Sequence, residues 1–213
     1  MAVTGDSARL EAFSDGVLAV AITLLALNLS IDGPGPGHGS LAHQLAGRWP
    51  VVAAYFVSFF TIGIIWVNHH ALFKTLTQID RTVLFLNLLL LLFVVVIPFA
   101  TSTMATYLRA GGNDAHLAAA LYGFVLEGMS LSFGSIFVWS IRRGHFRQEL
   151  EPAEARKAIL RFGFGNTVYL VAAGIAFLSA PLALALYGAI AAYYIFEQTP
   201  SAPEPVAETE TDG

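Results

Sequence analysis

The sequence contains no cysteine and few charged residues. The absence of cysteine from a chain of 213 residues excludes disulfides, thiolate metal sites and cysteine nucleophiles. Charged residues make up 12% of the chain, whereas soluble domains carry about 25%. Hydrophobic residues make up 56%, and they form continuous runs rather than the alternating pattern of a membrane β-barrel. The composition therefore predicts an all-α integral membrane protein, because a spanning helix pairs its own backbone polar groups.

Long apolar runs predict six transmembrane helices, each near the length of about 20 residues that a bilayer requires. These runs cover residues 10–30, 50–72, 83–107, 117–140, 159–178 and 180–196. Only residues 179–181 separate the last two runs, so we expect a tight helical hairpin there, with a re-entrant pair as the alternative.

Basic residues predict how the six helices are oriented, because Lys and Arg collect in cytoplasmic segments. If the N-terminus is cytoplasmic, only Arg48 and Arg109 lie on the outer side. The cytoplasmic segments then hold Arg9, Lys74, Arg81, Arg142, Arg143, Arg147, Arg156, Lys157 and Arg161. This bias predicts that the N- and C-termini are both cytoplasmic.

Two segments outside the spans are poor in apolar residues. Residues 32–39 are rich in glycine and proline, so we expect a flexible outer loop there. Residues 198–213 are acidic and lack aromatic side chains, so they cannot bury enough apolar surface to fold. We therefore divide the chain into a six-helix transmembrane domain, residues 1–197, and a disordered acidic cytoplasmic tail, residues 198–213.

Polar residues interrupt the first three predicted spans at a similar depth. Arg9, Ser14 and Asp15 lie in the first span, residues 66–70 end the second, and Asn87 lies in the third. Polar groups that lose water need hydrogen-bond partners. We therefore expect one network that joins three helices near the cytoplasmic surface, with direct ion contact by the charged residues as the alternative.

Other chemistry at these residues is disfavoured. A metal site at His69 and His70 is disfavoured because adjacent residues point to different faces of a helix. A hydrolase built from Ser14, His69 and Asp80 would need a strained nucleophile turn and an oxyanion hole, and neither can be recognised in the sequence. In the fourth span, Glu127 is interpreted as a protonated or locally hydrogen-bonded carboxyl rather than as an ion ligand.

Beyond Asp15 the first span is uncharged. Helical spacing places Val20, Leu24 and Leu27 on one face, next to a face of small residues that includes Thr23. On spacing alone, the ordinary interpretation is close packing between membrane helices.

The order of residues in the first span resembles a family signature. Arg9, followed after three residues by Phe13-Ser14-Asp15, is similar to the opening of the transmembrane protein 175 family. The end of the second span, residues 66–70, and the later Asn87 are similar to the prokaryotic branch of that family. The resemblance covers roughly the first 100 residues, and the last three spans match only in number and general character.

This resemblance implies a potassium-permeable cation channel. In the family's prokaryotic branch the six-helix protomer forms a homotetramer around a central pore lined by the first helix, and no Thr-Val-Gly-Tyr-Gly filter is used. The implied constriction consists of Val20, Leu24 and Leu27, with Thr23 as a polar ring. Val20 is smaller than the Ile or Leu expected at the first ring, so we expect a wider constriction. The implied inner structural network consists of Arg9, Phe13, Ser14, Asp15, Trp66, His70 and Asn87.

The resemblance also implies which partners the chain has. We expect K⁺ as the transported ion, the lipid bilayer and further copies of the chain as partners, no cofactor, metal, nucleic acid or enzymatic activity, and a location in a prokaryotic plasma membrane. A secondary transporter or proton-coupled carrier is the main alternative, because Pro98 and Glu127 would suit a broken helix and a titratable group. A non-conducting membrane scaffold is a further alternative.

Overall fold

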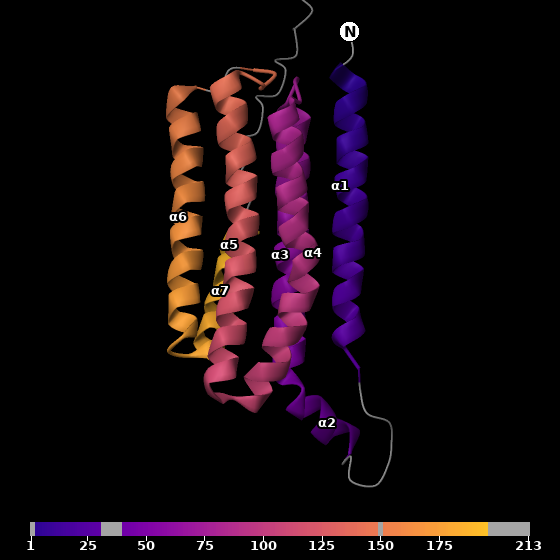
Figure 1. Cartoon of the computed structure of the whole chain (residues 1–213), viewed down its shortest axis with the longest axis vertical. Helices are drawn as coiled ribbons and strands as arrows, with labels where there is room; N and C mark the ends of the chain where they lie inside the picture. The colour runs from indigo at the N-terminus through magenta and orange to yellow at the C-terminus, as the bar shows by residue number, and fades with distance from the viewer. Residues whose placement is uncertain (1–2, 31–39, 149–150, 196–213) are drawn as a thin grey trace, which may run out of the picture.

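The computed structural model describes residues 3–30, 40–148 and 151–195, and these residues are helical almost throughout. The described helices are α1 (Val3–Leu25), the 3₁₀ turn η1 (Ala26–Asn28), α2 (Leu41–Gly47), α3 (Trp49–Thr75), α4 (Arg81–Ala110), α5 (Gly112–Arg143), α6 (Pro152–Ala176) and α7 (Ala180–Tyr194). The long helices run side by side along the long axis of the molecule, with α1 at one edge and α6 at the other (Figure 1). The predicted loop at 32–39 and the predicted tail at 198–213 lie outside the described residues.

Five of the described helical segments are long and apolar enough to cross a membrane. They are Ser7–Asn28, Trp49–Thr75, Arg81–Ala110, Gly112–Arg143 and Pro152–Ala176. The sixth predicted span corresponds to α7, a shorter apolar helix of 15 residues. At a rise of about 1.5 Å per residue, α7 is shorter than the hydrocarbon core of a bilayer. The all-α membrane fold is therefore confirmed, with five spanning-length helices and one shorter helix, and the sequence analysis missed α2.

Local sequence explains where the long helices begin and end. The carboxylate of Asp80 accepts a hydrogen bond from the Val83 amide at 2.8 Å and so caps the first turn of α4. Gly111, at φ 73°, forms the single-residue turn between α4 and α5. Gly144, at φ 65°, ends α5 in the left-handed conformation that glycine adopts without steric cost. The two longest helices, α4 and α5, therefore form a tight hairpin at the centre of the bundle.

The connections at one end of the bundle are joined by a short antiparallel bridge. Leu76, after α3, pairs with Phe146, after α5. The amide of Thr77 donates to the His145 carbonyl and the amide of Arg147 donates to the Thr75 carbonyl, each at 2.8 Å. The α3–α4 connection is therefore tied to the chain that follows α5.

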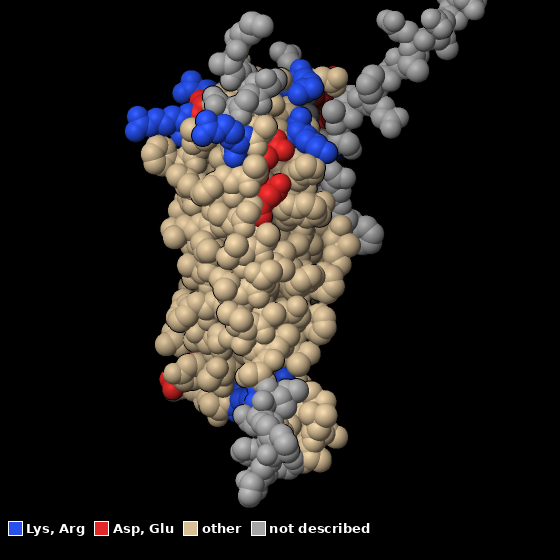
Figure 2. All heavy atoms as spheres, turned by 90° about the vertical axis from the view of Figure 1, so that its right-hand side faces the viewer, with Lys and Arg blue, Asp and Glu red and all other residues tan. Residues whose placement is uncertain are grey.

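Basic residues gather at this same end. Figure 2 shows a large group of Lys and Arg side chains at one end of the molecule and a smaller group at the other. The large group belongs to the N-terminus of α1, the C-terminal ends of α3 and α5 with the connection that follows α5, and the N-terminal ends of α4 and α6. Arg48 and Arg109 lie at the opposite end, before α3 and in the last turn of α4. Most basic residues therefore lie at one end of the bundle, and only Arg48 and Arg109 lie at the other, as the sequence predicts.

Candidate functional site

The helix α1 has one face that packs against the bundle. Leu18, Ala21 and Leu25 are almost fully buried, and Leu10 and Ser14 continue the same stripe toward the N-terminus. These residues are three or four positions apart, which is the spacing of one helical face. They pack against α3 and α4. One side of α1 is therefore fixed within the protomer.

The predicted constriction residues lie on the other side of α1. Val20 is 53% exposed, Leu24 is 39% exposed and Leu27 is 75% exposed. Thr23 is also exposed, and its hydroxyl donates to the Val20 carbonyl at 2.8 Å. None of the described residues covers this apolar face, which is available to lipid or to other copies of the chain.

Three buried side chains join α1, α3 and α4 inside the membrane. The amide nitrogen of Asn87, on α4, donates to the Ser14 hydroxyl at 3.0 Å. Its amide oxygen lies 2.8 Å from Nε2 of His69, on α3. The Ser14 hydroxyl in turn donates to the Leu10 carbonyl at 2.9 Å. Each of the three side chains is at most 1% exposed, so water cannot replace these bonds.

A second, more exposed set of contacts joins α1 to α3. The Trp66 indole donates to the Asp15 carboxylate at 2.9 Å. The Trp66 and His70 rings are stacked with their centroids 6.1 Å apart. Nδ1 of His70 lies 3.9 Å from a Glu11 carboxylate oxygen, and the Ser7 hydroxyl donates to the other Glu11 oxygen at 3.1 Å. Two polar contacts therefore hold the first half of α1 beside the last turns of α3.

The structure brings together most of the residues that were predicted to form the inner network, but with a different histidine at its centre. Asn87 pairs with His69, while His70 lies in the second set of contacts. His69 and His70 are adjacent residues of the same type, so residue type does not show which of them is buried. The helical spacing is a signal, because the face of α3 that carries the buried Ile62 and Ile65 also carries His69. The remaining two predicted residues, Arg9 and Phe13, are exposed and form none of these hydrogen bonds.

A third polar cluster lies at the N-terminal end of α4, where Asp80 and His145 are outside the membrane-spanning segments. The Trp139 indole donates to Asp80 at 2.9 Å, and Nε2 of the buried His145 lies 3.8 Å from the same carboxylate. Partial burial raises the pKa of Asp80, but hydrogen bonds from Val83 and Trp139 and the nearby His145 outweigh it. The pKa of Asp80 is therefore held below its ordinary value of 3.8.

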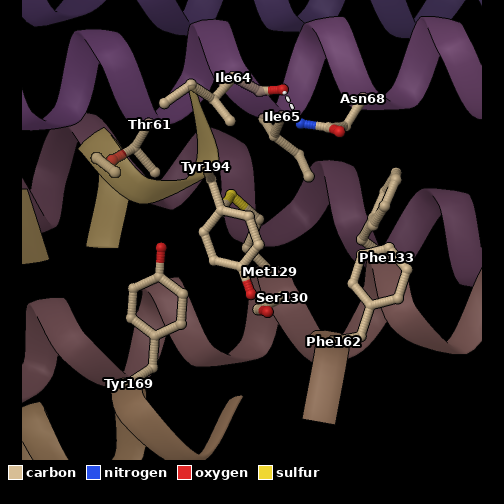
Figure 3. A pocket seen from close by; sticks show the side chains of 11 residues that line it. Thr61, Ile64, Ile65, Asn68, Met129, Ser130, Phe133, Phe162, Tyr169 and Tyr194 are labelled. Carbon is tan, nitrogen blue, oxygen red and sulfur yellow. Dashed lines mark hydrogen bonds between the residues drawn. The ribbon is translucent and has the colours of Figure 1, made fainter. Parts of the chain in front are cut away.

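A small cavity lies away from α1, among α3, α5, α6 and α7. Tyr169 and Tyr194 point into it, and Asn68 at its edge donates to the Ile64 carbonyl at 2.9 Å (Figure 3). Its volume of about 50 Å³ leaves room for a few water molecules. Glu127, on α5, is 4% exposed, and one of its carboxyl oxygens finds no hydrogen-bond partner among the described residues.

The described residues contain no group of three or more His, Asp or Glu side chains that could hold a metal ion. What the arrangement offers instead is an apolar helix face that is open on one side and anchored from behind by buried hydrogen bonds.

Comparisons with known proteins give this arrangement a family context. Residues 9–98 match the family model described as the endosomal/lysosomal potassium channel TMEM175. A protein of Streptomyces collinus named as a potassium channel is 45% identical over 199 residues, which cover 92% of this chain and 94% of that protein. The endosomal/lysosomal proton channel TMEM175 of Gallus gallus is 35% identical over 68% of this chain and 30% of its own length.

A solved structure matches the fold as well. The crystal structure of a lysosomal potassium-selective channel TMEM175 homolog from Chamaesiphon minutus superposes with a TM-score of 0.80 at 30% sequence identity. The match covers 92% of this chain and 100% of that chain. The relationship therefore extends well beyond the first 100 residues in which the sequence pattern is sharpest.

Proposed function

This chain belongs to the TMEM175 family, and on that premise we propose that it is a potassium-permeable cation channel of a prokaryotic plasma membrane. The bacterial relative that is named a potassium channel aligns with nearly the full chain, and the solved homolog is described as potassium-selective. Membership in a family of ion channels also agrees with the prediction that the chain is not an enzyme.

The pore is formed where copies of α1 meet around a shared axis. The observation that carries this proposal is the uncovered apolar face of α1, with Val20, Leu24 and Leu27 at its centre. One helix cannot enclose a water path, whereas several identical helices around a symmetry axis can. In a homotetramer with α1 innermost, the exposed apolar faces of all four α1 helices line the central axis.

The apolar rings restrict the pore without any charged side chain. A ring of small apolar residues such as Val20 can exclude water until the helices separate slightly, which is gating by dewetting. The Thr23 hydroxyl is bonded to the backbone of its own helix, so it presents a polar surface without carrying a charge. K⁺ passes these rings when the four helices move apart by a small rotation.

The inner network holds the pore helix from behind. Ser14, Asn87 and His69 bond across three helices, and Asp15 and Trp66 add a second connection. The basic end of the bundle faces the cytoplasm, together with the N-terminus of α1. Arg9 and Phe13 lie in the same part of α1, near the inner mouth of the pore.

Potassium flux from proteoliposomes tests the position of the constriction. We expect Val20→Ala and Leu24→Ala to widen the pore, raising the flux or lowering the preference for K⁺ over Na⁺. Leu92→Ala is the matched control, because Leu92 is 56% exposed on α4 and is assigned to no ring. If the two α1 variants behave like the control, the constriction lies elsewhere.

Because the chain contains no cysteine, a single introduced cysteine can test whether α1 lines the symmetry axis. A single Leu27→Cys substitution should form disulfide-linked dimers within the tetramer, because Leu27 is 75% exposed on the face assigned to the pore. Leu92→Cys should stay monomeric in the same oxidation experiment. Equal cross-linking of the two variants, or none for Leu27→Cys, would contradict an axis lined by α1.

A proton-coupled carrier is the second candidate, and Glu127 is the observation that favours it. Buried carboxyl groups inside the membrane mark proton pathways in pumps and transporters, and one oxygen of the buried Glu127 has no hydrogen-bond partner in the described part of the chain. A carrier would give K⁺ flux that saturates and requires a proton gradient, and Glu127→Gln would abolish it. A channel would conduct K⁺ without a proton gradient and would keep its flux in this variant.

A further inference from the structure

A groove runs between α5 and α6 toward the end of the bundle that carries most basic residues, and we call it the α5–α6 groove. The start of α4 closes one side of it. Its volume is about 460 Å³, within the range of about 300–1,000 Å³ that is usual for ligand pockets. Figure 1 shows α6 at the edge of the bundle opposite α1, with α5 beside it. The groove therefore lies on the side of the bundle away from α1.

The α5–α6 groove is about as long as one leaflet of a bilayer is thick. Arg142, in the last turn of α5, lines its basic end, and Leu131 is the lining residue farthest from it along α5. The two residues are 11 positions apart in one helix, which is about 16 Å at a rise of about 1.5 Å per residue. Half of the hydrocarbon core of a bilayer is about 15 Å thick. An acyl chain of the adjacent leaflet can therefore lie along the groove.

The walls of the groove are apolar and leave space between the helices. Leu131 is 48% exposed and Ile159, on α6, is 40% exposed. Gly163 also lines the groove, and a Cβ placed on it would meet nothing within 4 Å outside its own helical turn. The groove includes no residue of α1, so the face assigned to the pore takes no part in it. These walls suit a hydrocarbon chain.

The basic end of the groove offers donors to a phosphate group. Arg142 forms no ion pair with any of the described residues, and none of the residues that line the groove is acidic. A guanidinium group binds phosphate through two parallel N–H donors. The hydroxyl-bearing Thr82, in the first turn of α4, lines the groove as well. A phosphate at this end would therefore supply the counter-charge that Arg142 lacks.

Trp139 forms a fixed rim of the groove in the turn before Arg142. Its indole donates to Asp80 at 2.9 Å, and the guanidinium group of Arg143 lies 4.7 Å from the centre of its ring. Asp80 also accepts from the Val83 amide, and it is not one of the residues that line the groove. Trp side chains at the ends of membrane helices mark the boundary between hydrocarbon and water. Arg142 therefore lies at the depth of lipid phosphates.

We propose that the α5–α6 groove binds an anionic phospholipid of the leaflet adjacent to the basic end of the bundle. Arg142 holds the phosphate group, and one acyl chain lies between α5 and α6 as far as Leu131. A lipid fits better than a second copy of the chain, because a second copy would bring another basic end to the same depth, whereas an anionic headgroup compensates the charge. The proposal rests on the membrane fold and not on ion conduction.

Filling the groove without changing any charge tests its location. In native mass spectrometry of the purified full chain, Gly163→Leu should weaken binding of added phosphatidylglycerol about tenfold, because the new side chain occupies the space of the acyl chain. Gly174→Leu is the matched control. Gly174 is also on α6 with nothing within 4 Å of an added Cβ, but it does not line the groove. This control should bind the lipid as the wild-type chain does.

Removing the charge at the basic end tests the headgroup. The wild-type chain should bind phosphatidylglycerol more tightly than phosphatidylcholine. Arg142→Gln should weaken phosphatidylglycerol binding about fivefold, as expected for one lost charge near anionic lipid. Arg147→Gln is the control, because Arg147 is exposed at the same end but lines a different pocket. It should lose less than about twofold, since solvent screens a charge that does not touch the lipid.

Several results would overturn the proposal. Equal binding by Gly163→Leu and Gly174→Leu would contradict the location, and equal losses in Arg142→Gln and Arg147→Gln would show that the attraction is diffuse. A smaller oligomer in Gly163→Leu would show that another copy of the chain occupies the groove. Displacement of the lipid by inorganic phosphate at equal concentration would show an anion site without lipid specificity. Potassium flux measured on the same preparations reports separately on the proposed channel function.

Discussion

The two faces of α1 are made of similar residues but are held in different ways. The buried face packs against α3 and α4 through Leu18 and Leu25, and Ser14 adds a hydrogen bond to Asn87. The exposed face carries Val20 and Leu24, and no part of the chain that the structure describes covers them. The comparison shows that hydrophobicity alone does not assign a function to a membrane helix.

The physical reason lies in the solvent. Lipid tails are as apolar as leucine, so burial in a membrane protein is driven by close packing and by hydrogen bonds rather than by release of water. An exposed leucine on α1 therefore costs the protomer little, and the anchored face is the one whose contacts fix the helix. Substitutions on the two faces should consequently change different properties.

The largest difference is expected between Leu18→Ala and Val20→Ala. Leu18 is 1% exposed, so Leu18→Ala leaves a cavity against α3 and α4 and should lower the free energy of unfolding by about 2 kcal/mol or more. Val20→Ala should change it by less than about 0.5 kcal/mol. Unfolding titrations in detergent measure both values. Similar losses would show that the exposed face is also packed, and would remove the distinction between the faces.

A smaller effect is expected from Asn87→Leu, which sharpens the comparison by removing only hydrogen bonds. The variant leaves Ser14 and His69 without their shared partner, at a cost of about 1–2 kcal/mol in the same titration. Thr103→Val is the control, because Thr103 is bonded only to the Phe99 carbonyl of its own helix. If both variants lose the same stability, the buried network does not anchor α1.

The smallest effect is expected at Asp80, which caps the N-terminal end of α4. The buried face of α1 packs against this helix. The pKa of Asp80 is lowered in the folded protein, so its charged form stabilises the fold above the ordinary value of 3.8. That contribution is lost as the pH falls below this value and through the lower folded pKa. Asp80→Asn should therefore flatten the decline in melting temperature at acidic pH, and an unchanged decline would contradict this role.

The sequence predicts where the helices lie better than it predicts which of their side chains contact one another. Long apolar runs indicate the spans because backbone pairing leaves a membrane segment few alternatives. The polar residues Ser14 and Asn87 indicate a buried contact because they share one depth, and the structure places them 3.0 Å apart. The choice of His69 over His70 depends on how α3 is rotated, which packing against α4 decides.

Other features depend on parts of the chain that are far apart in sequence. The bridge between Leu76 and Phe146 and the contact of Trp139 with Asp80 join segments whose own residues carry no signal of each other. The length of α7 was overestimated because the apolar run in the sequence continues through residue 196, whereas the described helix ends at Tyr194 and is 15 residues long.

Each hydrogen bond at Asn87 has a fixed donor and a fixed acceptor, and this limits whether the network can transfer protons. Since the Ser14 hydroxyl donates to Leu10, it must accept from the Asn87 amide nitrogen, and the Asn87 oxygen is left to accept from His69. That oxygen selects the histidine tautomer with its hydrogen on Nε2. A carboxamide does not exchange protons as a hydroxyl or an imidazole does. The Ser14–Asn87–His69 chain therefore ties the helices together without relaying protons between α1 and α3.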